Sequence, residues 1–303
     1  MKKRLKTKKP DMVVINETQL AGNMVVSLGG YTTWTKNRTK KGGGGIATSV
    51  NQKHKDFAVG TGEGDEEDEY LITRLECFYP ALNVINSYGE QRSTRKEDIE
   101  KKWDRLRKEM EAIRLKGEFC ILAGDQNKLV GSDKLGVPGN SPEVSVGGRL
   151  LGELLATGDW FLVNGLDSKV VNGGPFTRQD PATGRLSCLD LFVTSRELLP
   201  YIEKLEIDSE REFTPARAVK EKGKYKKVFT DHFSSLLTLK NLPKKKENIS
   251  KKKTVWNFSK ENGWEDYKIT SDKLSEKVDN LVENQELTVQ EVINKFEVIH
   301  EKI

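Results

Sequence analysis

Long apolar runs and paired cysteines are both missing from this 303-residue sequence, and each absence excludes a class of protein. No stretch is long enough to cross a bilayer, and the N-terminus does not have the apolar core of a signal peptide. The three cysteines, Cys77, Cys120 and Cys188, lie far apart in apolar surroundings. An odd count with this spacing argues against disulfides and against a zinc site. We therefore expect buried free thiols and an intracellular protein.

Charge is distributed unevenly along the chain. The net charge of +5 consists of +6 from residues 1–9, −1 from residues 10–243, +5 from residues 244–253 and −5 from residues 254–303. Such basic runs either bind nucleic acid through counterion release or serve as solvated linkers.

We expect a basic arm or helix remnant at 1–9, one folded domain at 10–242, a lysine-rich linker at 243–254 and a helical tail at 255–303. The tail is too short for a core of its own, so it either packs on the domain or belongs to a longer parent protein.

The apolar run at residues 119–123 predicts a strand that is buried on both faces. It ends in Gly124-Asp125-Gln126-Asn127, and strand alternation places Asp125 and Asn127 on the same side. A carboxylate and an amide in this position suit the binding of water or phosphate. The same residues also occur in ordinary turns, in which Asp and Asn bind their own backbone.

Other patterns predict the elements around this strand. Apolar runs predict strands at 12–15, 46–50, 71–78, 82–86, 160–164, 189–193, 229–233 and 235–239. A helix begins at a predicted capping box of Thr94 and Glu97 and ends at Gly117, with apolar residues at helical spacing on one face. A second helix is expected at 148–157. The four glycines at 42–45 predict a tight turn, and the acidic run at 63–69 predicts a solvated hairpin loop.

Polar residues follow several of these apolar runs directly. They are Glu17, Tyr88, Asp125, Asn127, Asp190, Asp231 and His232. Isolated acids at the ends of buried strands would lose hydration without a partner, so their recurrence indicates one shared site. Carboxylates without a histidine or cysteine cluster favour a hard divalent cation, with Mg²⁺ as the first choice and Mn²⁺ as the alternative.

These residues resemble, in order, the motifs of the endonuclease/exonuclease/phosphatase superfamily, which includes deoxyribonuclease I. The resemblance covers residues 10–240 and rests on Asn16-Glu17-Thr18, the glycine turn before Ile46, Asn86-Ser87-Tyr88, Gly124-Asp125-Gln126-Asn127, Leu189-Asp190 and Thr230-Asp231-His232. Within this superfamily, the sequence resembles above all the endonuclease domain of non-LTR retrotransposons. In those proteins a lysine-rich linker and a segment like Val255-Trp256-Asn257-Phe258 lead toward a reverse transcriptase. The resemblance implies an α/β (α+β) fold, a four-layered α/β/β/α sandwich.

The resemblance also implies a role for each site residue. Glu17 and Asp231 would bind the metal, while Asp125 and Asn127 would orient or deprotonate the attacking water. His232 would contact the scissile phosphate with its ring fixed by Asp190, and Tyr88 would donate to the phosphate or the leaving group. Thr177 is a possible DNA contact. We expect DNA as the partner, a nuclear location, and a 3′-hydroxyl and a 5′-phosphate as products.

Two departures from the family pattern leave alternatives open. Family members have a strand upstream of the glutamate strand, and here that first strand is missing, since Met1 lies only ten residues before Asp11. Gln126 also replaces the aromatic residue that is common between the Asp and the Asn. The alternatives are another phosphodiesterase of the superfamily, acting on abasic DNA or a small phosphoester, and an inactive truncated relic that only binds nucleic acid.

Overall fold

A computed structural model describes most of the chain as far as residue 245. The described residues are 8–20, 22, 24–37, 44–61, 69–90, 94–130, 144–212, 214, 216–221, 224–245, 272–273 and 276. The chain divides into two compact units, Met1–Lys245 and Lys246–Ile303. The predictions for glycines 42 and 43, for the acidic residues 63–68, and for most of the N-terminal arm, the linker and the tail fall outside the described residues. None of the described helices is long and apolar enough to cross a membrane.

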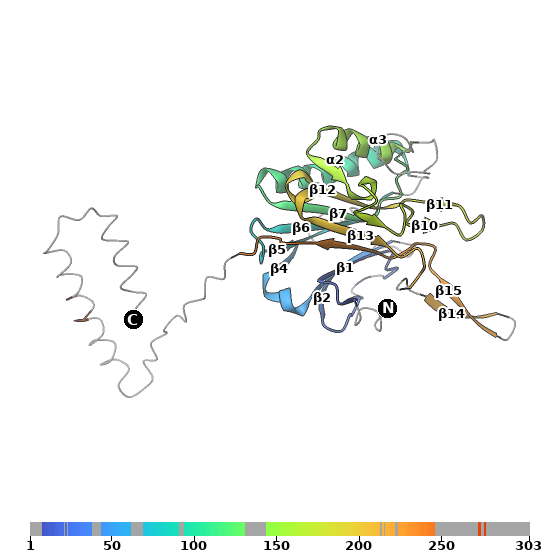
Figure 1. Cartoon of the computed structure of the whole chain (residues 1–303), viewed down its shortest axis with the longest axis horizontal. Coiled ribbons are helices and arrows are strands. Elements are labelled where there is room, and N and C mark those ends of the chain that lie inside the picture. Colours follow the sequence, from blue (N-terminus) through green and yellow to red (C-terminus); the bar gives the residue numbers. More distant parts are fainter. Residues whose placement is uncertain are drawn as a thin grey trace, which may run out of the picture. The chain divides into compact units, whose positions relative to one another are not determined.

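A six-stranded sheet forms the centre of the first unit, in the order β4-β5-β6-β7-β12-β8 (Figure 1). Its strands are β4 (Ala58–Thr61), β5 (Tyr70–Leu75), β6 (Leu82–Ser87), β7 (Phe119–Asp125), β8 (Trp160–Leu162) and β12 (Asp190–Ser195). β6 and β7 run parallel, whereas the other neighbours are antiparallel. Residues 119–123 of β7 are all buried, which confirms the prediction of a strand covered on both faces.

Helices α2 (Lys96–Leu115) and α3 (Val146–Ala156) cover one face of this sheet (Figure 1). From α2, Trp103, Leu106, Met110 and Ile113 enter the core beside Leu122 of β7. The predicted capping box is wrong, because the N-cap of α2 is Arg95, which makes no side-chain cap bond. The helix ends at Leu115, and Gly117 follows its C-cap with a φ of +71°, which suits glycine just after a helix.

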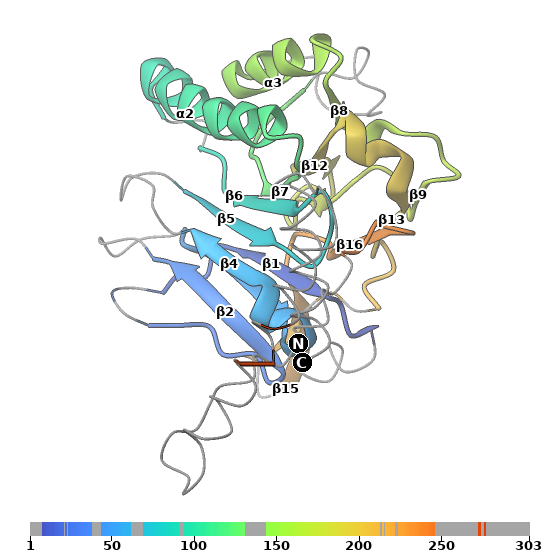
Figure 2. The same ribbon diagram turned by 90° about the vertical axis from the view of Figure 1, so that its left-hand side faces the viewer.

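The opposite face of the central sheet packs against a second layer of strands (Figure 2). This layer contains two three-stranded sheets, one in the order β1-β3-β2 and one in the order β16-β13-β9. The strands are β1 (Met12–Asn16), β2 (Tyr31–Lys36), β3 (Ile46–Asn51), β9 (Val171–Asn172), β13 (Ile202–Ile207) and β16 (Ser235–Leu239). The chain is thus a mixed α/β sandwich, as predicted.

The second layer is interrupted between its two sheets. Within the described residues, β1 is an edge strand of one sheet and β16 is an edge strand of the other. Both strands nevertheless contribute to one apolar cluster, with Met12 and Val14 from β1 and Leu237 and Leu239 from β16. The core is therefore shared across a line where no backbone ladder joins the two sheets.

The remaining elements are short. They are the 3₁₀ helices η1 (Gln52–Phe57), η2 (Val163–Gly165) and η3 (Arg196–Tyr201), the strand pair β10 (Arg178–Gln179) and β11 (Leu186–Ser187), and the hairpin β14 (Ala216–Glu221) and β15 (Lys224–Phe229). The strand predicted at 229–233 is wrong, because β15 ends at Phe229 and β16 begins at Ser235. None of the three cysteines forms a disulfide; Cys120 and Cys188 are buried as expected, whereas Cys77 is only half-buried.

Two glycines of α3 provide a matched test of how tightly this helix packs. A Cβ at Gly148 would lie 1.9 Å from the carbonyl oxygen of Leu129, whereas a Cβ at Gly152 would meet nothing within 4 Å. We predict that Gly148→Ala lowers the free energy of unfolding by roughly 1–3 kcal/mol through overpacking. Gly152→Ala should raise it by roughly 0.5–1 kcal/mol, because alanine costs less conformational entropy in a helix. Urea unfolding of both variants measures this, and equal effects would contradict the packing.

Candidate active site

Two carboxylates face each other at the end of the central sheet. β7 and β12 pair in a register that sets Asp125 directly opposite Asp190. Gly124 precedes Asp125 with a φ of +130°, so the chain bends at the end of the buried run. Asp125 is only 6% exposed. Like charges directly opposite each other in a ladder are destabilising, so this pair requires a compensating positive group.

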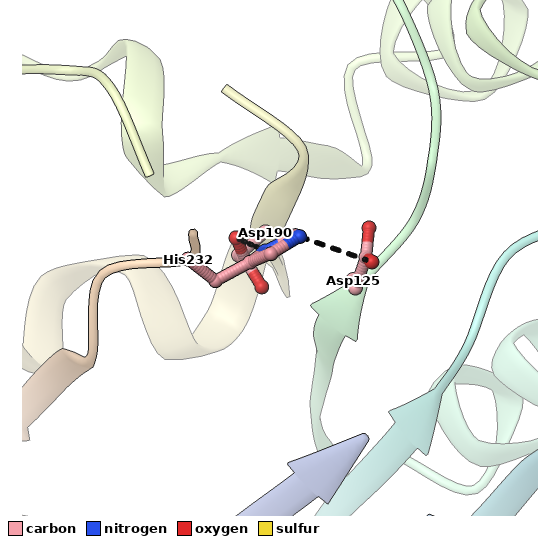
Figure 3. Close-up of side chains that lie close together, drawn as sticks. All are labelled: Asp125, Asp190 and His232. Carbon is pink, nitrogen blue, oxygen red and sulfur yellow. Dashed lines mark hydrogen bonds and ion pairs between the residues drawn. The ribbon is translucent and has the colours of Figure 1, made fainter. Parts of the chain in front are cut away.

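His232 provides that positive group (Figure 3). Its Nδ1 lies 2.8 Å from Asp190 Oδ2, and its Nε2 lies 3.8 Å from Asp125 Oδ2. The ring therefore lies between the two carboxylates with a different nitrogen toward each. His232 comes from the turn that precedes β16, far from both strands in the sequence.

The surroundings shift the pKa values of Asp125 and His232. Burial raises the pKa of Asp125 to about 7, and the charge of Asp190 adds to this rise. Burial alone would lower the pKa of His232. The hydrogen bond to Asp190 and the charges of the nearby aspartates outweigh burial and raise that pKa to about 9. At neutral pH the site thus contains a cationic imidazole and a carboxylate with a nearly neutral pKa.

Asn127 lies beside this cluster in a conformation that is uncommon outside glycine, with a φ of +47°. Its backbone N–H donates to Asp125 Oδ1 at 3.0 Å, and its side-chain amide donates to the carbonyl of Gly89 at 3.0 Å. The alternative interpretation of residues 124–127 as an ordinary turn is thus confirmed, since the Asp125 carboxylate binds the backbone two residues further on. The same turn holds the Asp125 carboxylate in place beside His232.

Asn16 is a site residue to which the sequence analysis assigned no role. Its side-chain amide donates to Asn86 Oδ1 at 2.9 Å and to the carbonyl of Ser87 at 3.1 Å, and its Oδ1 accepts the backbone N–H of Asp125 at 3.1 Å. One side chain of the second layer thereby ties the ends of β6 and β7 together. Its position directly before Glu17, after an apolar run, is the only sequence signal for this role.

Glu17 and Tyr88 meet at the edge of the site. The Tyr88 hydroxyl donates to Glu17 Oε1, and the Tyr88 ring is buried. Glu17 is exposed, with a φ of +51°, and its negative charge contributes to the raised pKa of Asp125. The structure therefore places Glu17 near Asp125, while the hydroxyl of Tyr88 is engaged by Glu17.

Asp231 is bound by an arginine. Its Oδ2 accepts from Arg178 Nε at 2.9 Å. The backbones of Arg178 and His232 also form an isolated antiparallel β-bridge. Arg178 was not among the predicted residues, and only its place beside Thr177 could have indicated it. Asp231 remains a predicted metal ligand, but in this conformation it is paired with a cation.

Thr177 is completely buried, which does not agree with a DNA contact. Its hydroxyl accepts the backbone N–H groups of Leu189 and Asp190 at 3.0 and 2.9 Å. Thr177 therefore holds the start of β12 and, with it, the position of Asp190.

Gln126 fills the interior at the position where the resemblance led us to expect an aromatic residue. It is fully buried, donates to the carbonyl of Ser87 at 3.2 Å and accepts from Lys128 Nζ at 3.1 Å. The Lys128 ammonium lies 4.0 Å from the centre of the Trp103 ring, and burial lowers its pKa to about 8. A hydrogen-bonded and cation–π contact thus replaces apolar packing behind Asp125.

Comparisons with known proteins agree with this geometry at the level of fold. No family model and no curated protein matches the sequence. Solved structures do match. They include the AP endonuclease LMAP from Leishmania major (16% identity, 78% of this chain and 80% of that chain, TM-score 0.55). A second is the endonuclease domain of TRAS1, a telomere-specific non-LTR retrotransposon (15% identity, 78% and 89%, TM-score 0.52). A third is the 3′-5′ exonuclease NExo from Neisseria meningitidis (16% identity, 80% and 92%, TM-score 0.56).

This chain has the endonuclease/exonuclease/phosphatase fold. The predicted resemblance is therefore confirmed for the fold. Several elements converge in this chain: the ends of β1, β6, β7 and β12, and the turn before β16. The cluster of Asp125, Asp190 and His232 lies where they meet.

The donor set at this point of the fold suits a divalent cation. One ligand atom from each of Asp125, Asp190 and His232 lies within 4.8 Å of the others. Two facing carboxylates are hard oxygen donors, which Mg²⁺ and Mn²⁺ prefer. The residues present therefore fit the expected metal, although its predicted ligands were Glu17 and Asp231.

The burial of Asp125 gives a pH-dependent prediction for Asp125→Asn, measured with a chelator present. Because the pKa of Asp125 is higher in the folded state than its usual value, ionisation destabilises the folded chain as pH rises from about 4 to 7. Removing the charge should raise the free energy of unfolding by on the order of 1–3 kcal/mol above pH 7, and by less near pH 4. The exposed Asp180 has a lowered pKa, so Asp180→Asn should give no such gain. A gain from Asp125→Asn that is the same at both pH values would contradict the prediction.

Proposed function

We propose that this chain is a divalent-metal-dependent phosphodiesterase that nicks DNA. The observation that supports this best is the arrangement of Asp125 and Asp190 as facing carboxylates with His232 between them, in a fold shared with DNA endonucleases and exonucleases. A half-buried cation is suited to bind a phosphate, and a carboxylate of raised pKa beside it is suited to accept a proton from water.

Asp125 is the proposed base. Its pKa of about 7 lets it take a proton from water near neutral pH, and the backbone of Asn127 orients its carboxylate. Water attacks phosphorus, the bond from phosphorus to the 3′ oxygen breaks, and the downstream strand keeps the phosphate on its 5′ end. The 3′ oxygen leaves as a hydroxyl once it has taken up a proton.

His232 is the proposed electrostatic partner of the phosphate. Asp190 binds Nδ1 and keeps the ring cationic, so the Nε2–H can donate to a phosphate oxygen as negative charge develops there. Tyr88 is the candidate donor to the phosphate or the leaving group, and for this its hydroxyl would exchange its bond to Glu17 for one to the substrate.

Asp125 and Asp190, with Glu17 and Asp231 as the further predicted ligands, would hold the metal. A bound Mg²⁺ or Mn²⁺ would neutralise phosphate charge and acidify water. Glu17 is the exposed member of this set and lies near enough for its charge to affect Asp125.

We further propose that the chain is the endonuclease of a retroelement. The shared fold with the TRAS1 endonuclease domain supports this, as do the lysine-rich segment at 244–253 and the Trp256 and Phe258 segment after it. Under this proposal, residues 10–242 are the nuclease domain, residues 255–303 lead toward a reverse transcriptase in a longer parent, and the protein acts on DNA in the nucleus.

Abasic-site cleavage is the second candidate. It is favoured by the equal structural likeness to the AP endonuclease LMAP. A duplex with a single abasic site, compared with the same intact duplex, separates the two. Preferential cleavage at the abasic position would support repair, whereas equal nicking of both would support a retroelement nuclease.

Relaxation of supercoiled plasmid tests the proposed activity. We predict nicking in Mg²⁺ that stops in chelator, and a rate for His232→Ala that is lower by a factor of roughly 10²–10⁴ because the cationic partner is lost. His54→Ala is the matched control, since His54 contacts Asp11 and Cys77, outside the cluster. No nicking by a folded wild-type chain would contradict the proposal and favour an inactive relic.

A further inference from the structure

The hairpin of β14 and β15 is a separate two-stranded sheet. Its ladder runs from the pair Ala216 and Phe229 to the pair Glu221 and Lys224, and within the described residues neither strand pairs with any other. In Figure 1 the hairpin extends from the body of the first unit. Two strands alone are marginally stable in water, so such a ribbon needs support from elsewhere.

The sequence of this hairpin is strongly basic. Residues 216–229 contain one acidic residue, Glu221, and six basic residues, Arg217, Lys220, Lys222, Lys224, Lys226 and Lys227. Their net charge of +5 contrasts with −1 for the whole of residues 10–243. The folded domain therefore concentrates its positive charge in one ribbon. Lysines also keep an exposed strand edge from pairing with another sheet, and that role would require no partner.

The base of the hairpin is fixed beside His232. At the end of β15, the Arg211 guanidinium lies over the rings of Phe229 and Phe233, 5.4 and 4.6 Å from their centres, and donates to the carbonyl of Thr230. Phe229 directly precedes the turn that contains His232, and Phe233 directly follows His232. The position of the ribbon is thereby coupled to the position of the catalytic ring.

The residues that lead into β14 are fixed in the same place as those that follow β15. Before β14, the buried Thr214 accepts the backbone N–H of Ser234 at 3.0 Å and donates its own N–H to Asp208. Asp208 also accepts the N–H of Glu212 at 2.7 Å. Both ends of the ribbon are therefore held within two residues of His232, which a solubilising role alone would not require.

We propose that the β14–β15 hairpin binds the phosphate backbone of duplex DNA next to the scissile phosphate. The proposal rests on the proposed nuclease function and names the surface that holds its substrate. Six residues of extended strand span roughly 20 Å, about the axial length of six base pairs, so the ribbon can follow several phosphates. Contacts of lysine with phosphate are independent of sequence, so the hairpin supplies affinity and orientation and does not select the target.

Charge removal on the hairpin tests this proposal in the full chain. The variant Lys224→Gln/Lys226→Gln/Lys227→Gln is compared with Lys101→Gln/Lys108→Gln/Lys116→Gln, a control that removes three exposed lysines on and just after α2. Binding to a 30-base-pair duplex is measured in chelator over a range of salt. We expect the slope of log K against log salt to become less negative by about 2–3 in the hairpin variant, with binding weaker by roughly tenfold or more, and to stay unchanged in the control.

The outcomes separate this proposal from the nuclease proposal. A reduced slope in the hairpin variant supports the hairpin, whether or not the wild type nicks plasmid. Equal slopes for the wild type and the hairpin variant would overturn it, even if the wild type proves to be a nuclease. No binding of DNA by the wild type would also overturn it. Equal thermal unfolding midpoints for the three proteins show that the substitutions act on binding and not on folding.

Discussion

The register between β7 and β12 sets Asp125 against Asp190, and this one pairing determines much of the site. Two facing carboxylates at the end of a buried ladder repel each other unless a cation lies between them. His232 lies there, and a divalent metal would add to the same compensation. Stability is thus given up at the position where the proposed chemistry requires charge, as is common at functional sites.

Several contacts that look structural serve to keep this register. Thr177 binds the start of β12, Asn127 closes the turn after β7, and Asn16 joins β7 to β6 from the second layer. Asn16 matters in particular because, in the part of the chain that the structure describes, the two sheets of the second layer share no ladder. Side-chain amides and a common apolar cluster provide the connection where backbone pairing does not.

The sequence predicted the parts whose signals are local. The continuous apolar run of β7 and the helical spacing of Trp103 and Met110 predicted buried elements, and both are observed. The ordered motifs predicted the fold, although the chain shares only about 16% identity with structures of that fold. Strands β2 and β13 were missed, because their sequences YTTWTK and IEKLEI show neither a continuous apolar run nor a strict alternation of polar and apolar residues. Asn16, Arg178 and the anchored hairpin depend on contacts between distant residues, for which a single sequence gives no pattern.

Titration of the His232 ring tests the central claim most directly. Among the three histidines, the signal that disappears in His232→Gln can be followed by heteronuclear NMR in chelator. A pKa near 9 that falls toward the usual value in Asp190→Asn would show an imidazolium held between two carboxylates. A pKa near 6.5 that does not respond to Asp190→Asn would show that the facing carboxylates do not share this cation, and would contradict the account.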